Sequence, residues 1–485
     1  MYRTTSDETV GHALPLTPGQ QTIWELITSL AEDDPGASRF TVVDFRRLEG
    51  ELDLPAFRRA LDDLTHRHQA LQTVFVTTGP DPLVRLDPGL PLPLEYVELS
   101  GESGRERAGQ LAQLAHGMRF RTFDLRQGPL WSVCLVRLGP AEHILMVSFF
   151  HAISDGWSCQ VFVEDLVHAY RARLGRCAPQ APLGVTLDAV SEMQAQTLAE
   201  SPRRDAYWRR HLLPLPPGQV FPPSDPSPHA DLTAEVRLPF TLDDHVAAGL
   251  RRLAWRARTT PFVTFLAAYV VALSRRTGRD RIVVGTTTLG RDTPLARRVI
   301  GQFTNNVYVE ARIAAADSFL DVIRSVHATM AEATRNVAPF KRIAHAVNPD
   351  FERCRPWPDN RFFDAWFQSA APAAPDLTYP ELRVSPVALA EPERTPQPAA
   401  FTAADVGPRI TEWHLRWAPI VVLDDDRHGG VVVFNRNLYD HDLVDGWIAD
   451  YRRVLAEMAA EPSRPAPGRP PSPHSSPTDG SVTCP

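Results

Sequence analysis

The sequence predicts a mixed α/β protein made of two halves that share the same kinds of element. In each half, short apolar runs typical of strands alternate with segments whose apolar residues recur every three or four positions, as in helices. Residues 175–187, which contain proline and glycine, separate the halves and are typical of a connector. The length of 485 residues also indicates more than one domain.

In the first half, Thr17-Pro18 predicts a helix start, because threonine is a good N-cap and proline suits the first helical position. That helix would run to Leu30. The remaining elements follow from periodicity: helices over 54–68, 105–120 and 157–174, and strands over 40–45, 74–76, 130–138 and 143–150. His66-Arg67-His68 closes the second helix and is interpreted as a solvated helix end.

In the second half, strands are expected over 236–240, 282–288, 413–423 and 430–435, and helices near 188–212 and over 242–255, 262–277, 318–336 and 442–460. Residues 370–398 are rich in alanine and proline and are interpreted as an extended loop. We therefore expect a flexible N-terminus over 1–13, lobes over 14–180 and 181–460, and a disordered tail rich in proline and serine over 461–485.

Composition narrows the classes of function. The net charge of −7 argues against a nucleic-acid binder, which would carry a basic stripe. Five cysteines without ligand spacing argue against a disulfide framework or a structural zinc site. The N-terminus lacks the apolar core of a signal peptide, and the longest apolar stretch, 262–273, is too short to cross a bilayer. We expect a cytoplasmic protein with no membrane partner.

The strongest functional candidate is His151, in the segment from Phe149 to Trp157. The apolar run 144–150 predicts a buried strand that ends at His151, and Asp155-Gly156 then opens a helix. A histidine at a strand end with an acid four residues later is a common way to present a general base. The alternatives are a buried structural histidine with Asp155 as helix N-cap, or a dyad in which Asp155 orients His151.

Other chemistries are disfavoured by spacing. His151 and Asp155 alone are poor zinc ligands, since no third histidine or cysteine lies nearby. The sequence has no G-x-S-x-G nucleophile elbow, and the stretch 285–290 lacks the lysine of a phosphate-binding loop. We therefore expect no covalent enzyme intermediate, no bound nucleotide, no metal and no bound cofactor.

Six separated segments, in order, resemble the motifs of the condensation domains of nonribosomal peptide synthesis, in the chloramphenicol-acetyltransferase-like superfamily. The resemblance covers about residues 14 to 460, and its motifs lie at 16–24, 67–75, 150–156, 207–208, 285–306 and 336–340. Phe150-His151-Ala152-Ile153-Ser154-Asp155-Gly156 stands where the family has H-H-x-x-x-D-G. Each motif alone is weak, whereas six in order are specific.

This resemblance implies two lobes arranged as a V around a central tunnel, with His151 near its middle as base or positioner of the acceptor. It also implies a structural ion pair between Asp155 and Arg291, and a place for the Gly156 amide near the oxyanion. Residues expected along the substrate tunnel are Phe150, Ser158, Asn305 and Gln368; a role at the helix start is the alternative for Ser158.

The sequence departs from the family at two positions of these motifs. Gln72 replaces an arginine of the second motif, and Phe150 replaces the first histidine of the active-site motif. By strand alternation the side chain of Phe150 should face away from His151, so we interpret this change as one of packing.

The resemblance implies a condensation enzyme that transfers an acyl or aminoacyl thioester, carried on the phosphopantetheine arm of a carrier protein, to an amine or hydroxyl. Since the sequence starts at Met1 with no adenylation or carrier segment attached, we expect a free-standing monomer served by an acyl or peptidyl carrier protein in trans. The acceptor would be a small molecule or carrier-bound. Two alternatives stay open: an acyltransferase that uses acyl-CoA, and a non-catalytic module that binds carrier proteins, which Phe150 alone supports.

Overall fold

The computed structural model describes residues 13–30, 37–38, 40–77, 82–99, 104–198, 201–214, 220–221, 235–348, 363–369, 376–387, 389, 419–424 and 429–466. The chain divides into two compact units. Unit 1 comprises residues 1–198, 289–304 and 371–409, and unit 2 comprises residues 199–288, 305–370 and 410–485. The expected single boundary at residue 180 differs from this division, because residues 181–198, residues 289–304 and the described part of 371–409 belong to unit 1.

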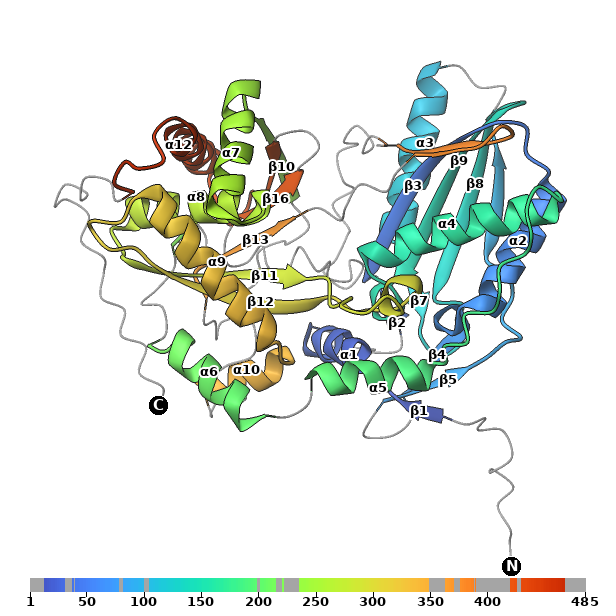
Figure 1. Ribbon diagram of the computed structural model, residues 1–485. Coiled ribbons are helices and arrows are strands. Elements are labelled where there is room, and N and C mark those ends of the chain that lie inside the picture. The colour runs from blue at the N-terminus through green and yellow to red at the C-terminus, as the bar shows by residue number, and fades with distance from the viewer. Residues whose placement is uncertain are drawn as a thin grey trace, which may run out of the picture. The chain divides into compact units, whose positions relative to one another are not determined.

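Unit 1 is organised around a six-stranded mixed sheet of order β14-β15-β3-β9-β8-β6 (Figure 1). The central strand β9 pairs antiparallel with β3 and β8, whereas β6 runs parallel to β8. Its strands are β3 (Thr41–Glu49), β6 (Leu94–Glu98), β8 (Trp131–Gly139), β9 (Glu142–Phe150), β14 (Leu377–Thr378) and β15 (Arg383–Pro386).

Helices cover both faces of this sheet, and the alternation of β9 decides which side chains each face receives. Phe149 packs against Phe162 of α4 (Gly156–Arg173). Met146 and Ile144 point to the other face and pack in a cluster with residues of α3 (Gly104–Arg119). Both faces of the sheet are therefore buried where β9 runs, which explains why β9 is apolar almost throughout.

Strands β14 and β15 come from the segment 370–398 that we expected to be an extended loop. In its described part, Arg383 to Pro386 pair antiparallel with Glu49 to Arg46 of β3. The expectation was wrong because the pairing partner lies more than 300 residues away in sequence, as for the hydrogen bond from Arg383 to Glu49. A short strand without periodicity has no local signal for such a pairing.

The other elements of unit 1 surround the sheet. Asp53 caps α2 by accepting a hydrogen bond from the Ala56 amide, 2.8 Å away. The expected helices and strands of the first half are present within a few residues of their expected ends. The remaining elements are β1 (Ala13–Pro15), α1 (Pro18–Leu30), β2 (Ala37–Ser38), α2 (Leu54–Arg67), η1 (Gln69–Gln72), β4 (Thr73–Val76), β5 (Leu83–Leu86), β7 (Phe123–Asp124), η2 (His151–Ile153), α5 (Leu187–Leu198) and η3 (Ala296–Arg298).

Unit 2 contains a second six-stranded mixed sheet, of order β10-β17-β16-β13-β11-β12. Its strands are β10 (Glu235–Thr241), β11 (Arg281–Thr288), β12 (Asn305–Arg312), β13 (Ala365–Ser369), β16 (Ile420–Asp424) and β17 (Gly429–Asn435). The antiparallel pair β16–β17 was expected from sequence, although residues 413–418 lie outside the described residues. The helices are α6 (Pro202–Leu212), α7 (Asp244–Ala257), α8 (Pro261–Thr277), α9 (Phe319–Arg335), α10 (Phe340–Val347) and α12 (His441–Ala460).

The core of unit 2 forms around α8, which is buried along most of its length and packs against α7, α9 and α12. Residues 461–466, expected in the disordered tail, are ordered instead: the Ala466 amide donates to the Asp317 carbonyl at 2.8 Å, and Ala466 is buried. Residues 467–485 lie outside the described residues, as does the expected flexible N-terminus apart from Ala13, which begins β1.

Within the described ranges, no single helix has both the length and the apolar character needed to cross a bilayer. Helices α7 and α8 meet that test only when taken together, and the chain bends by 104° between them.

Candidate active site

His151 lies where β9 ends and the short helix η2 begins. Its backbone amide donates a hydrogen bond to the Phe40 carbonyl at 2.7 Å, and its ring lies 5.9 Å from the Phe40 ring, centroid to centroid. The strand end fixes the backbone while the aromatic ring limits how the imidazole can turn. Phe40 is a neighbour that sequence reasoning missed, because the contact depends on β3 lying beside β9.

Burial favours the neutral form of the His151 imidazole. Burial lowers its pKa below the ordinary value of 6.5, and backbone hydrogen bonding at His151 and Ser154, together with the negative charge of Asp155, only partly opposes this. The Nδ1 atom is buried, although the residue as a whole is half-buried. The ring therefore has Nε2 as the nitrogen that can meet a substrate.

Asp155 is the N-cap of α4. Its backbone is extended, and its Oδ1 accepts a hydrogen bond from the Ser158 amide at 2.9 Å. The helix starts here because this carboxylate satisfies an amide that has no acceptor within the helix. The sequence-based alternative of Asp155 as a helix N-cap is thus what the structure contains.

Asp155 also forms an ion pair with Arg291, as the family resemblance implied. Arg291 Nη2 lies 2.7 Å from Asp155 Oδ1, and both side chains are at most 2% exposed. Arg291 belongs to residues 289–304, which are part of unit 1, so both charges lie within one compact body. Burial lowers the pKa of Arg291, and Asp155 opposes that shift by stabilising the cation.

Arg291 also donates hydrogen bonds to several backbone carbonyls, in addition to its contacts with Asp155. Its Nη1 donates to the carbonyls of Ala296 and Val299, the latter at 2.8 Å, and its Nη2 donates to the Gly301 carbonyl at 3.0 Å. The guanidinium also lies 4.3 Å from the centre of the Phe303 ring. A single buried cation therefore shapes the whole segment from 291 to 303.

Ser158 completes this buried network. Its hydroxyl lies 2.8 Å from Asp155 Oδ1, 2.8 Å from Arg291 Nη2 and 2.9 Å from the Gly301 carbonyl. Ser158 is fully buried. The expectation that Ser158 lines a substrate tunnel is therefore wrong, because its hydroxyl joins α4 to the 291–303 segment. The alternative, a role at the helix start, is correct.

The carboxylate of Asp155 is fully occupied by this network. Its Oδ2 accepts from Arg291 Nε at 3.3 Å and from the Phe303 amide at 3.1 Å, while Oδ1 has the contacts given above. Among the described residues, no hydrogen bond joins Asp155 to His151. A dyad in which Asp155 orients the imidazole directly is thus disfavoured, and Asp155 acts on His151 through the turn between them and through its charge.

Gly156 is the first residue of α4 and follows the cap directly. Amides of a first helical turn have no acceptor within the helix, and the helix dipole places positive potential at this end. Its partial exposure leaves room for an approaching atom. The role of the Gly156 amide near an oxyanion stays a prediction.

Phe150 is a core residue. Its side chain is 0% exposed and its ring meets the Phe75 ring edge-on at a centroid distance of 5.7 Å. Phe75 in turn stacks on Trp24 of α1. Phe150 therefore does not line an open passage, and the replacement of histidine at this position is accommodated as aromatic packing beneath His151.

Asn305 and Gln368 belong to unit 2. Asn305 begins β12 and pairs with Thr288, and Gln368 lies on β13, where its Oε1 accepts from Trp366 Nε1 at 3.1 Å. Because His151 belongs to unit 1, the expectation that these two residues line its substrate tunnel stays a prediction.

A second buried network holds the motif at 67–75. The carboxylate of Asp165 on α4 lies 2.8 Å from His68 Nε2 and 2.7 Å from Arg67 Nε. Burial would raise the pKa of Asp165, but hydrogen bonds from His68, Arg67 and Gln180 outweigh it and bring the pKa to about 2. His68 is 2% exposed, so the interpretation of 66–68 as a solvated end was wrong for this residue.

Two other kinds of reactive group could act near the site: the thiol of Cys159 and side chains that could bind a metal ion. Burial raises the pKa of the Cys159 thiol well above 9.0, so it stays protonated and is a poor nucleophile. No group of three histidine, cysteine, aspartate or glutamate side chains among the described residues could hold a metal ion.

The family of this chain follows from its similarity to known protein families. Residues 10–357 match the model of the condensation domain. The chain belongs to the condensation domain family. These are the condensation domains of nonribosomal peptide synthetases, and the matched range includes His151, Asp155 and Arg291.

Relatives of this condensation domain occur within much longer synthetases. Over 336 residues it is 32% identical to phosphinothricin tripeptide synthetase PhsC of Streptomyces viridochromogenes, covering 68% of this chain and 30% of that protein. The chain spans 4% to 28% of the length of seven further curated relatives.

Solved structures share the fold. The SgcC5 protein of Streptomyces globisporus matches with a TM-score of 0.71 at 24% identity, covering 93% of this chain and 100% of that one. The X-domain from teicoplanin biosynthesis matches with a TM-score of 0.73 at 22% identity, covering 96% of this chain and 99% of that one. The expected fold class, a mixed α/β fold like that of condensation domains, is confirmed.

Proposed function

We propose that this chain joins an acyl or aminoacyl thioester, carried on the phosphopantetheine arm of a carrier protein, to an amine or hydroxyl acceptor. The observation that carries the proposal is the place of His151, at a strand end next to the N-terminus of α4 and with Nδ1 buried. Burial also favours its neutral form by lowering its pKa. Membership of the condensation domain family supports amide bond formation as the general chemistry.

In the proposed reaction the acceptor nitrogen or oxygen adds to the thioester carbonyl carbon. The acceptor's proton passes to Nε2 of His151 as the new bond forms, and the carbonyl oxygen becomes an oxyanion near the Gly156 amide. The carbon–sulfur bond then breaks, and the proton held by His151 neutralises the thiolate. The thioester is already activated, so the reaction consumes no nucleotide.

The roles of the neighbouring residues follow from their contacts. Asp155 has both oxygens committed to Arg291, Ser158 and Phe303, so it acts as a positioning residue rather than as a proton carrier. Phe150 packs on Phe75. This packing role supports the proposal that a phenylalanine in place of the first histidine is compatible with activity. The remaining rate enhancement would come from holding two substrates at attack distance.

The test is a reconstitution. The purified chain is incubated with acyl- or aminoacyl-loaded carrier proteins, and separately with free acyl-CoA, in the presence of amine and alcohol acceptors, and products are identified by mass spectrometry. We expect product with the wild type and loss of about 100-fold or more in His151→Ala. His66→Ala, which removes an exposed histidine of the same unit, is the matched control and should retain activity.

Three results would change the assignment. Equal turnover by His151→Ala would overturn the role of this residue. A preference for free acyl-CoA over the carrier-bound donor would identify an acyl-CoA-dependent acyltransferase instead. Tight carrier binding with no transfer by either the wild type or His151→Ala would identify a non-catalytic carrier-binding module.

A further inference from the structure

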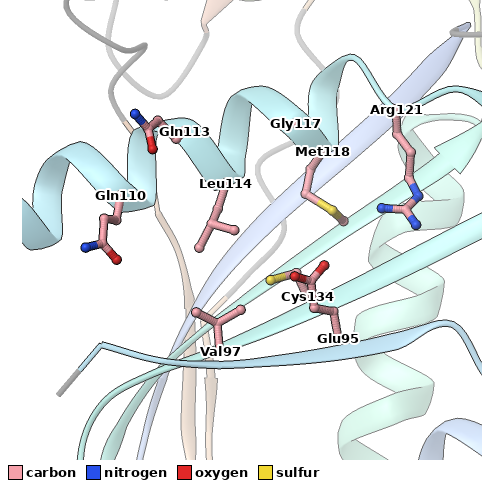
Figure 2. A pocket seen from close by; sticks show the side chains of 9 residues that line it. All are labelled: Glu95, Val97, Gln110, Gln113, Leu114, Gly117, Met118, Arg121 and Cys134. Carbon is pink, nitrogen blue, oxygen red and sulfur yellow. The ribbon is translucent and has the colours of Figure 1, made fainter.

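A recess lies in unit 1 between α3 and the edge of the six-stranded sheet, on the face opposite α4 (Figure 2). Its volume is about 470 Å³, which is within the range of small-molecule sites. The sheet contributes side chains from β6 and β8, and α3 forms the other wall. The lining residues are Glu95, Val97, Gln110, Gln113, Leu114, Gly117, Met118, Arg121 and Cys134.

One face of α3 forms a wall of the recess. The lining residues of α3 stand at positions 110, 113, 114, 117 and 118, the spacing of a single helix face. Gly117 lies beside Met118 near the C-terminal end of that stripe, and a Cβ placed there would meet no atom within 4 Å. Gly117 therefore adds no side chain to this wall of the recess.

The floor of the recess is apolar. Met118 and Cys134 are buried, and Val97 and Leu114 pack against the same cluster. Burial, and secondarily the charge of Glu95, raises the pKa of the Cys134 thiol to about 12. The thiol is therefore protonated at neutral pH and is a poor nucleophile.

Two opposite charges border the floor. Glu95, the partner of Cys134 in the parallel pairing of β6 with β8, brings a carboxylate, and Arg121 brings a guanidinium just after α3. Figure 2 shows both groups at the same end of the recess, with Gln110 at the other end. Both charges act on the Cys134 thiol, Glu95 raising its pKa and Arg121 lowering it.

Both charges are solvent-exposed, and neither is in an ion pair with a described side chain. Within the described ranges, the ion pairs of unit 1 include neither Glu95 nor Arg121, and the two side chains do not pair with each other. A ligand with a single charge would satisfy only one of them. A ligand with adjacent positive and negative groups and an apolar body would satisfy both charges and cover the floor.

We propose that this recess binds a free α-amino acid with an apolar side chain, its carboxylate facing Arg121, its ammonium facing Glu95 and its side chain over Leu114 and Met118. The site is separate from the network of His151, Asp155, Ser158 and Arg291, because none of these residues lines the recess. The inference does not depend on the proposed condensation activity.

The first test measures which charges a ligand needs. L-leucine, leucinamide, which lacks the carboxylate, and 4-methylpentanoate, which lacks the ammonium, are titrated into the intact protein and followed by calorimetry and saturation-transfer NMR. Because both charges are solvent-exposed, we expect L-leucine to bind with a Kd of about 0.1–1 mM and each analogue to bind about tenfold more weakly. Equal binding of all three ligands would overturn the proposal.

The second test locates the site. Gly117→Leu fills the recess, whereas Gly109→Leu adds the same side chain to the same helix outside the lining, where a Cβ also meets no atom within 4 Å. We expect Gly117→Leu to abolish leucine binding, and Glu95→Gln and Arg121→Gln each to weaken it about tenfold, with Gly109→Leu unchanged. Thermal unfolding would verify that each variant is folded.

Two outcomes would reject the proposal. One is the absence of saturable binding by leucine, methionine and phenylalanine up to about 10 mM. The other is leucine binding that survives Gly117→Leu in a folded protein, which would place the ligand elsewhere on the molecule.

Discussion

Asp155 and Arg291 form a buried ion pair across 136 residues of sequence, with Oδ1 and Nη2 2.7 Å apart. The pair joins the N-terminus of α4 to the segment 291–303, and that N-terminus follows His151 by only a few residues. The backbone that presents His151 is thus held in place by a contact that His151 itself does not make.

Breaking this pair should destabilise the protein more than any exposed ion pair does. Arg291→Ala leaves the Asp155 carboxylate buried with no cation, and removal of one partner of a buried pair typically costs about 3–5 kcal/mol. We expect a loss of that size in the free energy of unfolding, measured by urea denaturation. Arg383→Ala, which removes an arginine from exposed pairs with Glu49 and Asp376, should lower it far less, because solvent screens exposed pairs. Equal losses in the two variants would contradict the structural role given to Arg291.

The acid limb of activity should report the ionisation of His151. Only the neutral imidazole can accept the acceptor's proton, and burial places its pKa below 6.5. Activity should therefore be complete at pH 7 and fall only as the pH drops through that lowered pKa. The measurement is kcat/KM against pH with a condensation assay, on a donor whose own ionisation lies outside the range. An inflection above pH 6.5 would show that another group controls the rate.

Restoring the two-histidine motif should harm this protein rather than help it. Phe150→His places a polar ring in a fully buried site against the apolar ring of Phe75. We expect the free energy of unfolding to fall by about 2–3 kcal/mol, with no gain in kcat. Phe150→Leu keeps the site apolar and should cost less. A gain in kcat for Phe150→His would mean that the first position of the motif takes part in the reaction.

The Asp165 network should make stability depend on acid pH. Its pKa of about 2 lies below the ordinary 3.8, so its contribution is present above pH 3.8 and is lost as the pH falls toward 2. The shift corresponds to about 2 kcal/mol. Asp165→Asn should lower the free energy of unfolding at pH 7 by about that amount or more, since Arg67 would lose its counter-charge, and the difference from wild type should shrink at low pH.

The control for this prediction is Asp63→Asn. Asp63 pairs with Arg173 at the surface, where both side chains are more than a third exposed. We expect a change of less than about 1 kcal/mol and little variation with pH. If Asp165→Asn behaved like Asp63→Asn, the buried network would not contribute as described.

The local sequence pattern was sufficient to predict most of the helices and strands around His151. The apolar run before it predicted β9, and the spacing of Phe162, Leu166 and Tyr170 predicted α4, because both patterns report a face buried against the core. The ordered set of motifs indicated the family and paired Asp155 with Arg291. What these motifs could not place was Ser158, which shares the ion pair and is buried instead of lining a tunnel.

The sequence by itself determined the kinds of element, the family and the identity of the candidate base, because periodicity and short motifs are local properties of the chain. Only the tertiary structure decided which segments share a compact unit. Residues 291–303 join the start of α4 through Arg291, which contacts Asp155 and Ser158, and β15 pairs with β3. Both contacts join residues more than 100 positions apart, whose stability comes from burial and hydrogen bonds that exist only once the chain has folded.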